Sequence, residues 1–274
     1  MNVRSCFAMN RWCSSMSRVK KRFYEEARAV YKPVEKIYNI YLDEHCLVTP
    51  KKYPVQISSE ALAVAVAEEW NMQKNDLREN LMRLTGLIFT AIDNPTSLGK
   101  SDLISQILEF LEKDTVLYRL ENNKNILELQ KNRWDPVVEW VNMEYGLTAK
   151  PSYSIVEEAV VDDISRARLA NQLSAYSFFQ LIGLQYAVES LKSVFLTLAT
   201  VTHRLHVDEA VELALLEHEY QSSIWGKVEW AHDIEREELI SRLSAGVMAI
   251  NLSYSEVEKE KHEENDELSA LKFV

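Results

Sequence analysis

The amino-terminal part of the chain carries a period-two pattern of apolar side chains. Tyr38, Ile40 and Leu42 fall on every second position, which indicates a half-buried strand. Residues 43–44, an aspartate and a glutamate, predict a turn, after which residues 46–49 are expected to return as a partner strand. The beginning of the folded chain is therefore predicted to be small and β-containing.

Helical periods follow from residue 58 onward. Ser58 can cap a first helix, in which Leu62, Val66 and Trp70 share one face. Apolar stripes and end signals predict further helices at about residues 77–92, 101–111, 136–146, 163–200, 208–224 and 228–252.

The helix at 136–146 has a signal at each end. Asp135 followed by Pro136 predicts its start, because aspartate can cap a helix and proline suits a first turn that needs no amide donor. Gly146 predicts its end. Residues 115–120, TVLYRL, are predicted to be extended.

These patterns predict an α+β fold, with a small β-containing amino-terminal domain followed by a larger all-helical carboxyl-terminal domain. Residues 23–150 are expected to form the first part, with strands near 23–50 and helices after them. Residues 151–252 are expected to form the helical domain. Helix signals are few at 149–159, where we place the boundary, and the charged residues 253–274 predict a disordered tail.

Composition excludes several classes of protein. Only six glycines are present, which favours helices over folds rich in tight turns. The formal net charge of −11 argues against a nucleic-acid partner. The most apolar stretch, residues 177–201, carries Glu189 and Lys192 near its centre, so it predicts a buried helix and no stable membrane insertion.

The charge is distributed unevenly along the chain. Residues 1–22 hold six arginines and lysines and no acid, which leaves −17 for residues 23–274. An arginine-rich, serine-containing, acid-free leader is typical of a mitochondrial presequence. The alternative is a basic arm that binds an acidic partner. Cys6 and Cys13 lie in this leader, so Cys46 alone would remain, without a disulfide framework or a cysteine metal cluster.

One motif raises the question of a metal centre. Glu229 and His232 form an E-x-x-H pair, and carboxylate-bridged di-iron sites in helical bundles use two such pairs plus two further glutamates. This chain has no second pair. A helical carboxylate metalloenzyme using Glu229 and His232 is therefore the alternative hypothesis, against the simpler one that both residues lie on the polar face of a surface helix. Motifs of other common enzyme classes are absent, so no catalytic residue and no cofactor are predicted.

Two acidic residues lie beside an apolar stripe on the helix expected at 208–224. Glu217 follows Leu213 by four positions and precedes Tyr220 by three, and Glu219 lies next to the same stripe. A carboxylate in such a place pairs with a buried group inside the fold, meets a partner from outside, or extends to water. All three interpretations remain open for Glu217.

The stretch WGKVEWAHD, residues 225–233, predicts a junction between two helices. Gly226 can adopt the left-handed conformation that ends the first helix, and Trp225 and Trp230 are expected to pack around the corner. Trp70 and Trp134 are expected to be core residues.

Several stretches together resemble one family, that of the mitochondrial F1-ATPase assembly factors that handle the alpha subunit. The resemblance runs from about Lys21 to Leu252. The stretches are, in order, KRFYEE, LDEHCLVTP, SSEALAVAVAEEW, TAIDNP, KDTVLYR, LQKNRWDPVVEW and YQSSIWGKVEWAHD. Glu44 and His45 depart from the family, which tends to have a glycine and a basic residue there, and residues 26–36 match poorly.

The resemblance implies a non-catalytic chaperone of the mitochondrial matrix, free or peripheral to the inner membrane. Such a protein binds the unassembled alpha subunit, shields its subunit interface from aggregation and releases it to the beta subunit. It is expected to act as a monomer. The residues expected to bind the partner are Glu217, Glu219, Trp225, Gly226 and Glu229, with the carboxylates of Glu217 and Glu219 pairing with arginines of the alpha subunit.

Overall fold

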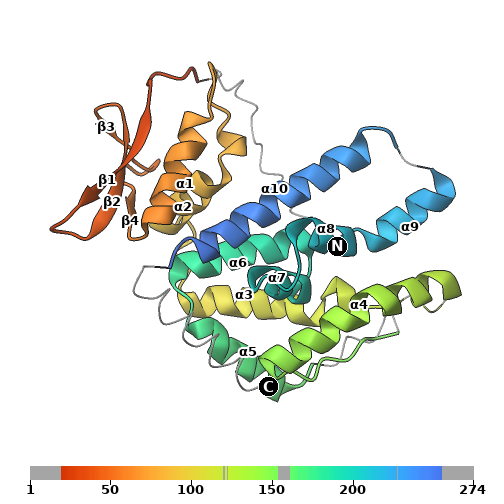
Figure 1. The fold of residues 1–274 in the computed structure, drawn as a ribbon. Helices are drawn as coiled ribbons and strands as arrows, with labels where there is room; N and C mark the ends of the chain where they lie inside the picture. The colour runs from red at the N-terminus through yellow and green to blue at the C-terminus, as the bar shows by residue number, and fades with distance from the viewer. Residues whose placement is uncertain (1–19, 120, 122, 154–160, 227, 255–274) are drawn as a thin grey trace, which may run out of the picture.

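A computed structural model describes residues 20–254, apart from 120, 122, 154–160 and 227 (Figure 1). A small antiparallel sheet with two helices forms one end, and the remaining helices form a bundle beside it, as predicted for an α+β fold. The strands are β1 (Ala27–Lys32), β2 (Ile37–Leu42), β3 (His45–Cys46) and β4 (Gln56–Ile57). The α-helices are α1 (Glu60–Asn71), α2 (Arg83–Asp93), α3 (Lys100–Glu112), α4 (Lys124–Tyr145), α5 (Asp163–Ser174), α6 (Phe178–Leu191), α7 (Val194–Val201), α8 (Val207–Ala214), α9 (Leu216–Trp225) and α10 (Ala231–Asn251).

Strand β2 is the centre of the sheet and confirms the prediction of a strand, although its burial does not alternate, because Asn39 is buried as well as Ile40. It pairs antiparallel with β1, β3 and β4, and the β2–β3 turn lies at residues 43–44 as expected. Asp43 takes a positive φ of 51° in this turn, and its carboxylate accepts hydrogen bonds from the backbone amides of Glu25 and Glu26. Strands β1 and β4 have no clear alternation in the sequence, and they form because β2 offers two edges to pair with.

Residues 20–22, assigned by charge to the leader, are tied into the fold. The Arg22 guanidinium donates to the backbone carbonyl groups of Tyr24 and Asn71, at 3.0 and 3.1 Å. The amide of Leu77 donates to the carbonyl of Lys20 at 2.8 Å. The rest of the predicted presequence, residues 1–19, lies outside the described residues.

The first two helices start at different residues from those predicted. Helix α1 follows Ser59 instead of Ser58, and the Ser59 hydroxyl donates to the carbonyl of Leu252 at 2.5 Å instead of capping its own helix. Trp70 on α1 is buried, as expected. Helix α2 begins only at Arg83, because the Glu69 carboxylate of α1 accepts the amides at its start, including that of Leu84 at 2.8 Å. Because the capping group belongs to another helix, the sequence near residue 83 gives no sign of where α2 begins.

The predicted start of α4 at Asp135 is wrong. The helix begins twelve residues earlier, where the Asn123 side chain caps it, and it includes Pro136 in its interior. Asp135 instead binds the guanidinium of Arg119, with an N–O distance of 2.5 Å, so its carboxylate serves a tertiary contact. Gly146 ends the helix with φ of 62°, as predicted.

The long helix expected at 163–200 is three helices, α5, α6 and α7. Ser177 and Gln180 form a capping box at the start of α6, while Lys192 ends it with a positive φ of 56° and Ser193 caps α7. Residues 115–117, expected to be extended, form a 3-10 turn. The breaks between these helices could not be seen in the sequence, because all of α7 is buried and shows no periodic polar face.

Helices α6 and α10 cross at the centre of the bundle through two glycines. A Cβ atom on Gly246 would lie 2.8 Å from the carbonyl oxygen of Gly183 and 2.9 Å from the Cβ of Ala187. A Cβ on Gly183 would lie 3.0 Å from that of Ala249. The backbones therefore approach more closely here than any side chain would permit.

The division of the chain at 149–159 stays a prediction. Helices α3 and α4, which precede it, pack on α5, α6 and α7, which follow it. Within the described residues, no helix is both long enough and apolar enough to cross a membrane. Ser253 and Tyr254 continue from α10 as part of the fold, and the remainder of the predicted tail, residues 255–274, lies outside the described residues.

Candidate partner-binding site

The stretch WGKVEWAHD forms the turn between α9 and α10, at the end of the molecule away from the sheet (Figure 1). The helix expected at 208–224 is interrupted at Leu215, so α8 and α9 are separate. Gly226 ends α9 with φ of 93°, a conformation that favours glycine, and Trp230 precedes α10 with φ of 69°. A junction of two helices at this place was predicted correctly.

The side chains of this turn are exposed instead of packed. Trp225 is 78% exposed and Trp230 is 76% exposed, which corrects the expectation that they pack around the corner. Trp225 is the last residue of α9, and Trp230 lies directly before α10 with a positive φ. Three further exposed apolar side chains lie within four positions of them along the chain, and we call the whole set the apolar tip: Ile224, Trp225, Val228, Trp230 and Ile234.

An apolar tip of this composition is unusual on a protein that functions alone. Contiguous exposed apolar surface of large side chains marks sites of contact with other proteins. Tryptophan is also the residue type that contributes most to such contacts when it becomes buried. In addition, a non-glycine residue with positive φ, such as Trp230, is a form of backbone strain found most often at functional sites.

Three glutamates near the apolar tip differ in how far they are buried. Glu219 on α9 and Glu229 in the turn are exposed. Glu217 is half-buried, and its Oε1 accepts a hydrogen bond from Nε2 of the fully buried Gln130 at 2.5 Å. Burial raises the pKa of the Glu217 carboxyl, while the hydrogen bond from Gln130 and the guanidinium of Arg119 oppose that rise. Of the three interpretations left open for Glu217, the structure therefore shows a hydrogen bond to a group inside the fold.

The RWDP stretch of α4 lies directly behind Glu217. Trp134 is buried and donates its indole N–H to the carbonyl of Leu213 at 2.9 Å. The Arg119 guanidinium, which pairs with Asp135, also lies over the Trp134 ring at 5.2 Å from the ring centroid. This network joins α4 to the end of α8 and fixes α9 beside it, so it gives the apolar tip a rigid base.

The E-x-x-H pair is not a metal site of the kind that was considered. Glu229 lies in the turn before α10 and His232 within the first turn of the helix, so the two do not share a helical face. The residues that the structure describes contain no group of three or more histidine, cysteine, aspartate or glutamate side chains placed to hold a metal ion.

His232 instead meets His218 across the helix pair. Their Nε2 atoms lie 3.1 Å apart, Ser222 Oγ lies 3.3 Å from Nδ1 of His232, and Glu235 lies 3.6 Å from Nδ1 of His218. The tautomers of the two rings decide which Nε2 atom donates to the other, and the Ser222 hydroxyl can donate to or accept from Nδ1 of His232. The contact fastens α9 to α10 just below the apolar tip. Sequence reasoning missed it, although the two histidines lie on either side of the predicted turn.

Comparison with known proteins finds similarity in sequence and in fold. The model of the ATP12 chaperone protein family matches residues 21–142. The mitochondrial protein atp12 of Schizosaccharomyces pombe is 28% identical over 221 residues, which cover 76% of this chain and 75% of that protein.

Solved structures share the architecture over most of the chain. The Atu1473 protein of Agrobacterium tumefaciens superposes with a TM-score of 0.78 at 26% identity, covering 85% of each chain. Atp12 of Paracoccus denitrificans superposes with a TM-score of 0.76 at 24% identity, covering 86% of this chain and 99% of that one, and this second likeness concerns the fold alone. In sequence the chain is similar to the ATP12 chaperone family over residues 21–142, and its likeness to the mitochondrial protein atp12 extends over 76% of its length.

Proposed function

We propose that this protein is a mitochondrial assembly chaperone that binds the unassembled alpha subunit of F1-ATPase, shields its subunit interface and releases it to the beta subunit. The match to the ATP12 chaperone protein model over residues 21–142 and the similarity to a mitochondrial atp12 protein support the general function. The acid-free leader supports import into the matrix. The choice of the alpha subunit rests on the resemblance of the sequence stretches.

The observation that carries the proposal is the apolar tip. A subunit made for a ring exposes apolar interfaces before it assembles, and such surfaces aggregate. Trp225 and Trp230 offer two large, exposed rings that can cover a surface of this kind. The turn is held by the His218–His232 contact and by the network behind Glu217, so little conformational freedom is lost on binding.

The carboxylates at the border supply the polar part of the proposed interface. Glu219 and Glu229 are exposed and can pair with arginines that the alpha subunit would otherwise present to the beta subunit. Glu217 lies at the inner edge, where its second oxygen can take part while the first stays on Gln130. Charged pairs at an interface rim contribute specificity and rate of association, and a partner with better complementarity can then displace the chaperone.

A single experiment separates this function from its alternatives. The chain from residue 20 onward is co-expressed with the F1 alpha subunit or with the beta subunit, and each mixture is passed through gel filtration with excess chelator. Co-elution with the alpha subunit alone, at the mass of one copy of each protein, is the expected result. Absence of a complex with either subunit would refute the proposed function.

The site is tested with substitutions at exposed positions. Trp225→Ser together with Trp230→Ser should abolish co-elution without changing the far-ultraviolet circular dichroism, because neither ring packs on the core. Met143→Ser is the matched control, since Met143 is 74% exposed and lies on α4, away from the tip. Equal loss of binding in the control would show that the tip is not the contact surface.

A further inference from the structure

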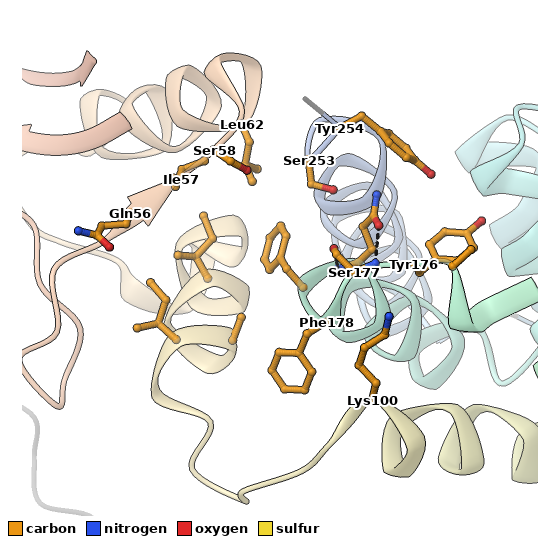
Figure 2. Close-up of a pocket in the computed structure, with 16 residues that line it drawn as sticks. Gln56, Ile57, Ser58, Leu62, Lys100, Tyr176, Ser177, Phe178, Ser253 and Tyr254 are labelled. Atoms are coloured by element: carbon orange, nitrogen blue, oxygen red, sulfur yellow. Dashed lines mark hydrogen bonds between the residues drawn. The ribbon is translucent and has the colours of Figure 1, made fainter. Parts of the chain in front are cut away.

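A cavity of about 750 Å³ lies where the sheet-bearing end of the molecule meets the helical bundle (Figure 2). It is at the opposite end of α10 from the apolar tip, because Ser253 and Tyr254, which follow α10, line its wall. Its volume is within the range of about 300–1000 Å³ that proteins use to bind small ligands or groups of side chains. Nothing in the proposed function uses this cavity.

The walls of the cavity are predominantly apolar. Figure 2 shows Ile57 and Leu62 on one side and Tyr176, Phe178 and Tyr254 on the other. Phe178 is only half-buried, so part of its apolar surface is left for an occupant. Among the described residues that line the cavity, Lys100 is the one charged group, and its Nζ donates to the carbonyl of Ser174 at 2.9 Å. Two further ammonium hydrogens of Lys100 remain for other acceptors.

The chain itself contains a segment with the complementary pattern, beginning just after the cavity wall. Residues 255–267, SEVEKEKHEENDE, hold seven acids and two lysines, and residues 268–274 read LSALKFV. A charged stretch would not enter an apolar cavity without a large desolvation cost, whereas Leu268, Leu271 and Phe273 would gain by burial. We propose that residues 268–274 bind in this cavity as an internal ligand.

The length of the connecting stretch suits such binding. Tyr254 lies at the cavity and thirteen residues separate it from Leu268. Thirteen residues can span a distance of roughly 20 Å, so the connecting stretch is long enough for the apolar segment to reach the cavity. Tethering at this range gives an effective concentration on the order of 1 mM, and even a segment with weak intrinsic affinity then occupies its site most of the time.

Charge complementarity supports the same occupant. Asp266 and Glu267 immediately precede Leu268, so they would reach the opening when the apolar residues enter. Lys100 lines the cavity, is exposed to solvent and has free hydrogen-bonding capacity. A carboxylate paired with Lys100 would set the direction in which the segment enters. This proposal goes beyond the proposed function and does not depend on it.

The test follows access to the cavity in the full chain. Cys6, Cys13 and Cys46 are replaced by serine, and the exposed cavity residue Ala175 is replaced by cysteine as a reporter. The rate of its reaction with a bulky maleimide is measured with the natural tail and with Leu268→Ser, Leu271→Ser and Phe273→Ser combined. Val257→Ser, in the charged stretch, is the matched control.

We expect the triple substitution to accelerate labelling by at least about tenfold, in line with a tethered ligand at millimolar effective concentration, and the control to leave it unchanged. Equal rates in all three chains would overturn the proposal. A chain with both Ala175→Cys and Phe273→Cys tests whether the two positions lie close together. A disulfide within one copy supports the proposal. A disulfide-linked dimer refutes it, because the cavity would then bind the segment of a second copy. Hydrogen exchange of residues 175–182 in the chain with its natural cysteines gives an independent measurement, with faster exchange expected only in the triple variant.

Discussion

Replacing Gly246 by alanine should destabilise the protein, although alanine is the better helix former. The substitution would put a methyl group 2.8 Å from the carbonyl of Gly183 and 2.9 Å from the Cβ of Ala187, so α6 and α10 must move apart. Overpacking of this kind costs about 1–3 kcal/mol, against a gain of about 0.5–1 kcal/mol from the higher helix propensity of alanine. A net loss of about 1–2 kcal/mol in the free energy of unfolding is expected.

Gly86 provides the matched control, because it also lies within a helix but has open space around it. A Cβ atom there would meet no heavy atom within 4 Å, so Gly86→Ala should stabilise the protein by about 0.5–1 kcal/mol. The two variants should therefore differ by about 1.5–3 kcal/mol in urea unfolding followed by circular dichroism. At roughly 2–4 °C per kcal/mol, their midpoints of thermal unfolding should differ by at least about 3 °C. A Gly246→Ala protein as stable as the Gly86→Ala protein would refute the close crossing of α6 and α10.

Three other substitutions test separate contacts. Asp114→Asn should cost about 2–4 kcal/mol in urea unfolding, because the buried Asp114 carboxylate accepts the amides of Val194 and Phe195, at 2.6 and 3.0 Å, and an asparagine NH₂ group there would face donors. Trp70→Ala should cost about 3–5 kcal/mol by the same measurement, since this side chain is in the core of the sheet-bearing end, and an effect below about 1 kcal/mol would contradict that placement. Glu217→Gln keeps an acceptor for Gln130 but removes the charge. Burial raises the pKa of the Glu217 carboxyl in the folded state. The stability that Glu217 contributes is therefore fully present below its unfolded pKa and is lost as pH rises through its folded pKa. The free energy of unfolding of the Gln variant should accordingly rise relative to that of the natural chain from pH 4 to pH 7. If it falls relative to the natural chain instead, the fold favours the charged form of Glu217.

Local patterns were sufficient for strand β2, for the burial of Trp70 and Trp134 and for the break at Gly226. They failed where a residue acts on a distant element. Asp135 followed by Pro136 resembled a helix start, and the ion pair of Asp135 with Arg119 could not be recognised from the sequence. The start of α2 depends on Glu69 from another helix, and α7 is buried on all sides, so neither gave a periodic or capping signal.

The candidate site could also be predicted only in part from the sequence. The sequence located the α9–α10 junction and its carboxylates, but aromatic residues at a turn are as compatible with packing as with exposure. The exposure of both tryptophan rings depends on how α9 and α10 meet in three dimensions. The contact between His218 and His232 likewise depends on the register of two helices, which composition does not determine.

The hydrogen bond between Ser59 and Leu252 has a consequence for the order in which the molecule forms. It joins residues 193 positions apart, the start of α1 and the end of α10. During synthesis the sheet and α1 become available long before their partner at the far end. Contacts of such high sequence separation form late and slow folding. The bundle-facing surface of the sheet-bearing end therefore stays open until α10 is made, and the chain is most vulnerable to aggregation and proteolysis in that interval.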